Sequence, residues 1–270
     1  MRAKLLVIDP QNDFCDIAGA ALPVAGADAD MTRLATLMRR ARAALSDLIV
    51  TLDSHASVSI ERTTFWKQAN GDAVAPFTEI TERAVRERRY SPRKESLRGD
   101  VLEYLRALEA RGRYKLTVWP VHCVVGTWGH NIHAAIAAEL AAWEEATQTP
   151  ALRVLKGFNP MTEQYSAVRA EVPREDDPRT QSNAVLIERA VPDAGNWLLV
   201  AGEAASHCVA ATMTDLFETM PLDDRRRVVI LRDCMSAVAG FEAAAERFFA
   251  QAVALGARVM TANQAAAELN

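Results

Sequence analysis

The stretch Lys4-Leu5-Leu6-Val7-Ile8-Asp9 is a short apolar run that lies between two charged residues. Similar aliphatic and β-branched runs recur later in the chain, at Leu48–Leu52, Leu116–Trp119, Trp197–Ala201, Val228–Leu231 and Arg258–Met260. Between them lie segments with apolar residues at helical spacings of three and four, at residues 29–45, 100–110, 131–146, 207–219 and 242–255. Apolar strands that alternate with helices are typical of a parallel sheet with helices on both faces. The pattern therefore predicts an α/β fold with three layers, α/β/α, and a mainly parallel central sheet.

Two segments depart from this alternation. Residues 82–98 are crowded with arginines, and residues 172–182 are rich in proline and charge. Charged connections usually lie at the surface as solvated loops, and the alternatives here are a lid, a contact to an anionic substrate or a subunit interface. Neither segment is typical of a domain linker, because strands and helices alternate again afterwards. We expect a single domain over residues 1–270 with an insertion near 57–114.

The composition narrows the class of protein. The chain has 270 residues, is 50% hydrophobic and carries a formal net charge of −4, so it is typical of a globular protein and offers no positive field for nucleic acid. Its apolar runs are too short for a signal peptide or a membrane span. The four cysteines have no paired spacing, which favours free thiols and a cytoplasmic protein. We expect a small-molecule substrate and no nucleic-acid or membrane partner; a homo-oligomer is compatible with this composition.

Ligands of parallel sheets bind at the carboxyl ends of the strands, so polar residues directly after apolar runs are the first to consider. Asp9 follows the first run, Asp53 and His55 follow the second, and His122 follows Leu116–Trp119. The list is completed by Lys156, which ends an apolar stretch, and by Cys208, which a turn after residue 202 brings to the start of a helix.

Asp9, Lys156 and Cys208 supply the groups of a nucleophilic site. The N–H groups at a helix start favour a thiolate over a thiol, and an ammonium group nearby lowers the thiol pKa further. A carboxylate would carry protons to and from the leaving group. The alternative is that Cys208 is an inert small hydrophobic residue, which is the common role of a buried cysteine.

Asp53, His55 and His122 form a second group. An Asp-x-His pair places two side chains on the same side of an extended segment, and a third ligand from a neighbouring strand end would complete a metal site open to water. Carboxylate and imidazole ligands suit Zn, Fe or Mn. The alternative for so short a motif is a hydrogen-bonded loop without a metal.

Five motifs together resemble those of the nicotinamidase branch of the isochorismatase-like cysteine hydrolases, in the order that this family has. The motifs are Asp9-Pro10-Gln11-Asn12-Asp13-Phe14-Cys15, Asp53-Ser54-His55, Trp119-Pro120-Val121-His122-Cys123, Lys156-Gly157 with Tyr165-Ser166-Ala167 downstream, and residues 202–209. The Trp-Pro-x-His-Cys element discriminates most, because the metal-free relatives lack its histidine. The resemblance covers most of the chain and implies an isochorismatase-like fold with Rossmann-like topology.

The resemblance also implies a role for each matching residue. Cys208 corresponds to the nucleophile, Asp9 to the carboxylate that shuttles protons and Lys156 to the lysine of the triad. Asp53, His55 and His122 correspond to the ligands of a divalent metal, Zn in the first place, with Fe and Mn as alternatives. Phe14 and Trp119 correspond to aromatic residues that line the ring pocket. The Glu203–Ala204 peptide bond falls where the family has a cis bond, which would direct the N–H groups of Ala204 and Cys208 at an oxyanion.

The implied reaction is hydrolysis of nicotinamide, or of a related small aromatic or cyclic amide, to the carboxylic acid and ammonia. It would run through a thioester on Cys208, and nicotinamide as substrate would place the enzyme in NAD salvage. The alternatives are hydrolysis of another amide or carbamoyl compound by the same triad, and a non-catalytic ligand-binding protein.

Several residues depart from the family pattern. Ala205-Ser206-His207 stands where a Thr-Asp-Tyr-like run is usual, Ser54 stands where an aromatic residue is frequent, and Glu203 occupies a commonly apolar position. His207 is interpreted as a helix-start or packing residue. The insertion near 57–114 would rebuild the mouth of the pocket, so the substrate follows less directly from the resemblance than the reaction does.

Overall fold

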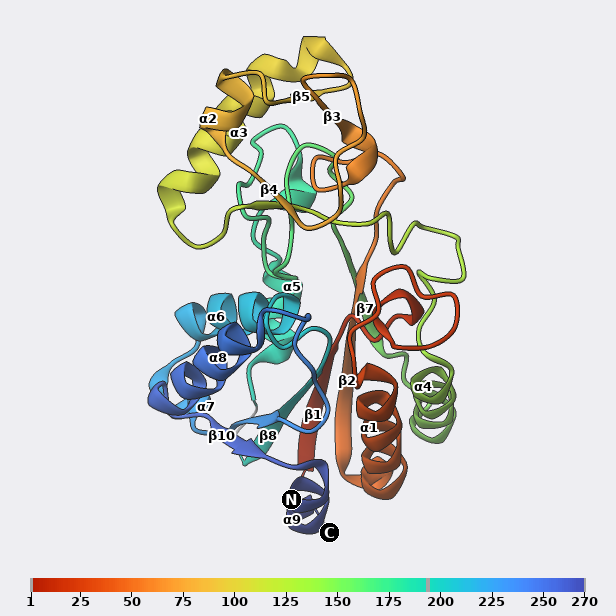
Figure 1. The fold of residues 1–270 in the computed structure, drawn as a ribbon. Coiled ribbons are helices and arrows are strands. Elements are labelled where there is room, and N and C mark those ends of the chain that lie inside the picture. The colour runs from red at the N-terminus through yellow and green to blue at the C-terminus, as the bar shows by residue number, and fades with distance from the viewer. Residues whose placement is uncertain (1, 193–194, 270) are drawn as a thin grey trace.

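The centre of the protein is a parallel sheet of six strands. The computed structural model describes residues 2–192 and 195–269, and Figure 1 shows their arrangement. Every pairing in this sheet is parallel. From one edge to the other the strands are β10 (Arg258–Met260), β9 (Val228–Leu231), β8 (Asn196–Gly202), β1 (Arg2–Ile8), β2 (Leu45–Asp53) and β7 (Leu152–Lys156). The predicted α/β fold is therefore confirmed.

Helices cover both faces of this sheet. On one face α1 (Ala27–Ala41) packs against α4 (Ala134–Thr147) and α9 (Ala262–Leu269), and on the other α6 (Cys208–Thr219) and α8 (Glu242–Ala254) lie together (Figure 1). The short helices α5 (Ala184–Ala190) and α7 (Leu222–Arg225) accompany α6. Strand β1 lies between β8 and β2, and residues Ala3 and Leu5–Ile8 are fully buried. This explains why its sequence is a continuous apolar run.

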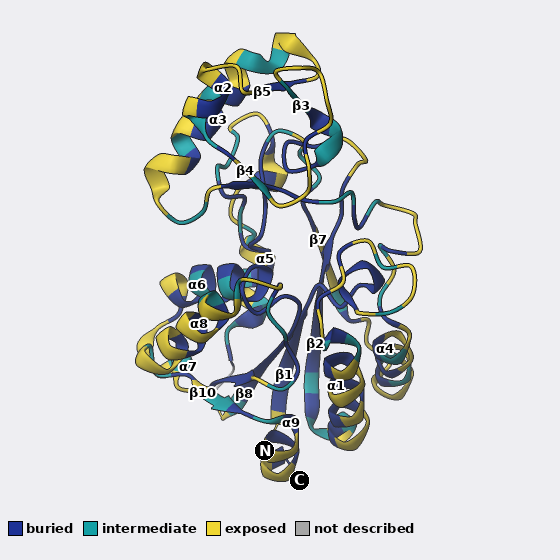
Figure 2. Cartoon of the chain, in the orientation of Figure 1, coloured by how far each residue is buried: buried dark blue, intermediate teal, exposed yellow. Residues whose placement is uncertain are grey.

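The insertion forms a separate lobe with a hydrophobic core of its own. It contains α2 (Glu82–Arg86), α3 (Arg98–Arg111) and two antiparallel pairs, β3 (Trp66–Gln68) with β5 (Tyr90–Pro92), and β4 (Thr78–Ile80) with β6 (Leu116–Val118). Trp66, Val101 and Leu105 are fully buried in it, and Figure 2 shows buried segments enclosed by exposed ones at this end of the molecule.

The prediction that Leu116–Trp119 belongs to the parallel sheet was wrong. Val118 pairs with Thr78, and Leu116 pairs with Ile80, both in antiparallel register within the insertion lobe. An apolar run signals burial on both sides, but it does not identify the core in which the strand is buried. The parallel strand next to β2 is instead the run that ends at Lys156.

Two helix boundaries differ from those expected, and one helix is additional. The helix expected over 29–45 ends at Ala41, and Leu45 already begins β2 as a buried strand residue. The helix expected over 131–146 begins at Ala134, and the C-terminal helix α9 was not predicted. The alanines of α9 carry a weak periodic signal, although Ala265 and Ala266 are buried against the body of the protein.

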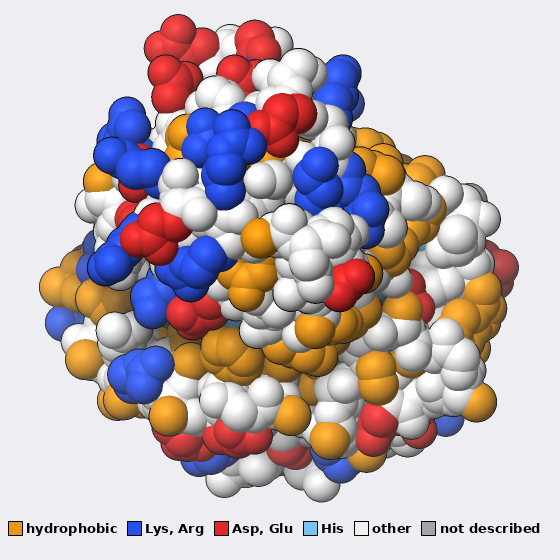
Figure 3. Space-filling model, turned by 45° about the horizontal axis from the view of Figure 1, so that its top comes forward, with side chains coloured by type: hydrophobic (Ala, Val, Ile, Leu, Met, Phe, Trp, Pro, Cys, Tyr) orange, Lys and Arg blue, Asp and Glu red, His pale blue; other side chains and the backbone are white. Residues whose placement is uncertain are grey.

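Several arginines of residues 82–98 form ion pairs at the surface, namely Arg83, Arg86, Arg88 and Arg89. Arg83 pairs with Glu87 and Arg86 pairs with Glu82, each one helical turn apart. On the face drawn in Figure 3, the Lys and Arg side chains of this lobe alternate with acidic ones. Solvated pairs of this kind contribute little to stability, and their arrangement agrees with the interpretation of the segment as a solvated surface.

Two further expectations bear on the environment of the protein. Cys15, Cys123, Cys208 and Cys234 are all free thiols, as their spacing predicted. Among the described residues, no helix is long and apolar enough to cross a membrane.

The backbone at Gly202 leaves no room for a side chain, which yields a first prediction. A Cβ at Gly202 would lie 1.9 Å from the carbonyl oxygen of Ile8, and its φ of +121° is unfavourable for L-residues. Gly202→Ala is expected to lower the free energy of unfolding by about 3 kcal/mol or more in urea denaturation. Gly99→Ala is the matched control, because a Cβ at Gly99 meets nothing within 4 Å; equal stability of the two variants would contradict this account.

Candidate active site

Four strands of the sheet bring the predicted nucleophilic group together. Asp9 follows β1, Asp53 ends β2, Lys156 ends β7, and Cys208 begins α6 after β8. Nζ of Lys156 lies 2.9 Å from Oδ2 of Asp9, 2.7 Å from Oδ1 of Asp53 and 3.6 Å from Sγ of Cys208. The ammonium group therefore connects the two carboxylates and the thiol at one point.

Burial and charge set the protonation of this group. Burial lowers the pKa of Lys156, but Asp53 and Asp9 outweigh it and raise the pKa well above its usual value, so the amine is an ammonium. Burial raises the pKa of Asp9, with Lys156 opposing and Asp53 adding to the rise. These shifts leave Asp9 a stronger proton acceptor than an ordinary carboxylate.

The thiol of Cys208 differs from the sequence-based expectation. Burial raises its pKa well above the usual value, Lys156 lowers it, and the charges of Asp9 and Asp53 raise it again. The lysine that was expected to favour the thiolate lies within reach, but it is already paired with two carboxylates. The resting group is therefore a thiol beside a carboxylate that is able to accept its proton.

The polar residues between Asp9 and Cys15 fix the loops around this group. The side chain of Gln11 donates to the carbonyl oxygen of Asp53 at 2.8 Å and accepts from the Asp53 N–H at 2.7 Å. Asn12 donates to the carbonyl oxygen of Trp128, and Asp13 accepts from the N–H of Cys123. The loop after β1 thus holds the end of β2 and the loop after β6 in place.

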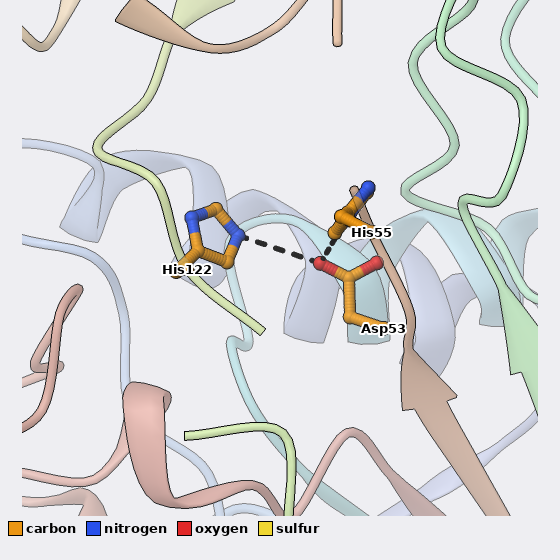
Figure 4. A group of neighbouring side chains, drawn as sticks. All are labelled: Asp53, His55 and His122. Carbon is orange, nitrogen blue, oxygen red and sulfur yellow. Dashed lines mark ion pairs between the residues drawn. The ribbon is translucent and has the colours of Figure 1, made fainter. Parts of the chain in front are cut away.

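Asp53, His55 and His122 also meet, on the other side of the Asp53 carboxylate (Figure 4). Nε2 of His55 lies 2.7 Å and Nε2 of His122 lies 3.4 Å from Oδ2 of Asp53. The three side chains are buried, and one ligand atom of each lies within 4.8 Å of the others. A carboxylate and two imidazoles at this spacing are a donor set that suits Zn, Fe or Mn.

Nδ1 of each imidazole lies near a protein oxygen, and Nε2 of His122 also lies 3.0 Å from Nη1 of Arg62, a contact that a metal at Nε2 would replace. Nδ1 of His122 lies 2.9 Å from the carbonyl oxygen of Pro120, and Nδ1 of His55 lies 3.2 Å from Oε1 of Glu61. Partners of this kind orient the histidines of metal sites. Gly157 provides the space, because a Cβ there would lie 2.5 Å from the His55 ring. These residues fit a divalent metal.

Neighbouring charges give the two imidazoles different pKa values. Burial and the Arg62 guanidinium lower the pKa of His122 to about 4, so that ring is neutral at neutral pH. Burial and Arg62 also lower the pKa of His55, but Asp53 and Glu61 outweigh them and raise it to about 8. A metal would have to displace the proton of His55 to bind its Nε2, so binding there would release a proton near neutral pH.

A pocket opens onto both groups. Its cavity volume is about 30 Å³, enough for only a few water molecules, so a ring substrate needs side chains of the wall to move apart. Phe14 and Trp119, both expected there, lie in its wall. The complete lining is Phe14, Leu22, Asp53, His55, Glu61, Arg62, Trp119, His122, Glu163, Tyr165, Ala204, His207, Cys208 and Val238.

The backbone next to Cys208 also has the expected form. The Glu203–Ala204 peptide bond is cis. Among the hydrogen bonds of the described residues, those around this turn use the N–H groups of Glu203, Ala205 and Val209, but none uses those of Ala204 or Cys208. Both N–H groups are therefore free to receive an oxyanion, which is the role implied for them by the resemblance.

Four polar residues of the pocket were not predicted from the sequence. Glu61 and Arg62 come from the insertion, Glu163 from the segment after Lys156, and His207 from the start of α6. Burial and Glu61 raise the pKa of Glu163 to about 8. Neighbouring charged residues in a segment that otherwise resembles a surface loop carry no signal of burial, so only the fold reveals them.

The metal-ligand group generates a second prediction, which does not depend on activity. Protein loaded with zinc and dialysed is expected to retain about one equivalent, measured by elemental analysis, and His122→Ala is expected to bind zinc at least about a hundredfold more weakly. His133→Ala is the control, because His133 pairs with Asp28 away from this group. Equal zinc affinity of the two variants would contradict the assignment.

The chain matches no protein-family model and no curated protein sequence. A yeast nicotinamidase has a similar structure, with a TM-score of 0.65 and 21% identity over 96% of this chain and 99% of the yeast chain. A pyrazinamidase of Pyrococcus horikoshii, in complex with zinc, gives 0.54 and 19% over 97% and 99%. An isochorismatase family protein of Desulfovibrio vulgaris gives 0.51 and 21% over 99% and 97%. The chain therefore has the fold that these nicotinamidases and isochorismatase-family proteins share.

Proposed function

We propose that this protein is a cysteine amidohydrolase that converts nicotinamide, or a related small aromatic or cyclic amide, to the carboxylic acid and ammonia. The observation that carries the proposal is the position of the Lys156 ammonium, 3.6 Å from Sγ of Cys208 and 2.9 Å from the Asp9 carboxylate, where Cys208 lines a pocket with aromatic walls. Two of the similar structures are a nicotinamidase and a pyrazinamidase, which supports a small aromatic amide as the substrate.

The first half-reaction uses Asp9 as a base and then as an acid. Asp9 accepts the thiol proton of Cys208 while Sγ forms a bond to the amide carbonyl carbon. The N–H groups of Ala204 and Cys208 stabilise the oxyanion, and Lys156 stabilises the charge left near Sγ. Asp9 then donates its proton to the amide nitrogen as the carbon–nitrogen bond breaks. Ammonia leaves, and the acyl group remains on Cys208 as a thioester.

The second half-reaction returns the enzyme to its starting state. Asp9 accepts a proton from a water molecule while the water oxygen bonds to the thioester carbonyl carbon. The bond to Sγ breaks, the carboxylic acid leaves, and Cys208 recovers its proton from Asp9. The raised pKa of Asp9 suits both directions of this transfer.

Asp53, His55 and His122 would hold a divalent metal, zinc in the first place. A bound metal would supply a Lewis acid at the pocket wall, able to orient a ring lone pair or to acidify water. Asp53 has a double role, because its other oxygen accepts from Lys156. The Asp53 carboxylate thereby contacts both the metal-ligand histidines and Lys156 of the triad.

A second candidate is hydrolysis of another amide or carbamoyl compound by the same triad. It is favoured by Glu61 and Arg62, which the insertion places in the pocket. Arg62 is fully buried, and its Nη2 atom has no hydrogen-bond partner among the described residues. A buried donor of this kind favours a more polar substrate, and turnover across a panel of amides would separate the two candidates.

The proposal predicts ammonia release from nicotinamide by the zinc-loaded protein. Cys208→Ala is expected to lower kcat by at least about a thousandfold, because it removes the nucleophile. Cys234→Ala is the control, since this buried thiol lies outside the pocket lining. Ammonia release by Cys208→Ala at the wild-type rate would reject the proposal. Release by wild type from other amides but not from nicotinamide would favour the second candidate.

The acid side of the pH profile should report Asp9, which must be ionised to accept the thiol proton. The hydroxyl of Thr51 donates to Oδ1 of Asp9 at 2.5 Å and lowers its pKa. Thr51→Val removes this bond, so the Asp9 pKa rises, and the acid limb of kcat/KM is expected to move about one unit to higher pH. A limb that stays in place or moves to lower pH would contradict the role of Asp9.

A further inference from the structure

His207 lies in the wall of the pocket, directly before the nucleophile. It is the residue that precedes the first turn of α6, and 6% of its surface is exposed. Its ring centre lies 5.2 Å from that of Trp119, 5.3 Å from that of Tyr165 and 4.7 Å from that of Phe241. The imidazole is therefore held within an aromatic wall, and its orientation is fixed by packing.

The hydrogen bonds of Ser206 determine which nitrogen of this imidazole has the proton. Oγ of Ser206 accepts from the N–H of Val238 at 3.1 Å and lies 2.9 Å from Nδ1 of His207. The structure gives the hydroxyl proton of this buried serine no other acceptor among the described residues. Because buried hydroxyl groups donate where an acceptor is available, Ser206 donates to Nδ1. Nδ1 is then the acceptor, and the proton is on Nε2.

The resulting Nε2–H group has no protein partner among the described residues, and His207 lines the pocket. No hydrogen bond of the described residues involves Nε2 of His207, and this atom retains accessible surface. Burial lowers the pKa of His207 to about 4, so the ring is neutral at neutral pH. A neutral donor in the pocket wall gains from a ligand that provides an acceptor, and a ligand that covers it without one leaves it unpaired at a cost.

The ring neighbours of this donor differ from those of the metal-ligand group. In that group, the His122 ring centre lies 5.2 Å from that of Phe14 and 5.7 Å from that of His55. His207 lies instead among Trp119, Tyr165 and Phe241. The indole N–H of Trp119 does not serve the same purpose, because it donates to the hydroxyl of Tyr165 at 3.0 Å.

We propose that His207 is a specificity-determining residue whose neutral Nε2–H binds a lone pair on the substrate ring, so that the site favours ring amides that carry one acceptor more than nicotinamide does. The inference rests on the proposed amidohydrolase function and goes beyond it by naming the feature of the substrate that is read. A ring nitrogen, a ring carbonyl or an ether oxygen provides such an acceptor.

The test compares substrates that differ by one atom. The zinc-loaded protein is given nicotinamide and the diazine carboxamides in which one ring CH of nicotinamide is replaced by nitrogen, and kcat/KM is measured by ammonia release. At least one diazine is expected to lose about three- to tenfold, relative to nicotinamide, in His207→Phe compared with wild type. A ratio of two substrates within one variant does not depend on the fraction of folded protein.

Leu22→Ala is the matched control, since Leu22 lines the same pocket and its replacement leaves the aromatic residues around the imidazole unchanged. Wild-type ratios for every diazine in His207→Phe would overturn the proposal, and so would an equal change of the ratios in Leu22→Ala. Failure of the proposed function has a different signature, namely that wild type releases no ammonia from nicotinamide or from any diazine.

A second measurement does not require activity or a variant that folds well. Long-range ¹H–¹⁵N correlation spectra of histidine-labelled wild-type protein report the tautomer of each ring, and the chain has five histidines. The His207 signals, assigned with His207→Phe or through contacts to Trp119 and Tyr165, are expected to show a neutral ring with its proton on Nε2 at pH 7. A proton on Nδ1, or on both nitrogens, would overturn the proposal.

Discussion

The buried ammonium of Lys156 is the interaction on which the site depends. It pairs with Asp9 and Asp53 at 2.9 and 2.7 Å and reaches Sγ of Cys208 at 3.6 Å. Two carboxylates at this depth would repel each other and protonate without a cation between them, and a lone ammonium would lose its proton. The three charges therefore stabilise one another. Removal of any one would change the protonation of the others, so the triad and the metal-ligand group behave as one electrostatic unit.

The fold provides this unit by bringing the ends of four parallel strands to one edge of the sheet. β1 lies at the centre, and the loop after it holds its neighbours through Gln11, Asn12 and Asp13. The insertion adds Glu61, which orients His55, and Arg62, which lies against His122. The reactive group thus comes from the ends of the central strands, whereas part of the pocket wall comes from the insertion lobe.

The sequence predicted the α/β fold and brought forward the residues that the structure places together. Each of these residues follows an apolar run, and parallel strands end at one edge, so position after a run was informative for Asp9, Asp53 and Lys156. The same rule failed for Leu116–Trp119, because its apolar residues are buried in the insertion lobe and not in the central sheet. His122 is nevertheless close to Asp53, since the loop after β6 returns to the sheet edge.

Other features depend on contacts between distant parts of the chain. The pKa of the Cys208 thiol is set by burial and by two carboxylates as well as by the lysine, and their balance is absent from any local pattern. His207 was interpreted as a packing residue, and it does pack among aromatic rings. Its tautomer, however, depends on Ser206 and on the N–H of Val238, about thirty residues away in sequence, so only the fold assigns it a donor.

The central claim is that Cys208 carries the acyl group of the amide during turnover. The most direct test is mass spectrometry of protein mixed with nicotinamide, quenched in acid within the first turnovers and digested. The account predicts a nicotinoyl group on the peptide that contains Cys208, removable by hydroxylamine as a thioester is. Ammonia release from nicotinamide without an acyl group on Cys208, or with the acyl group on another residue, would contradict this role of Cys208.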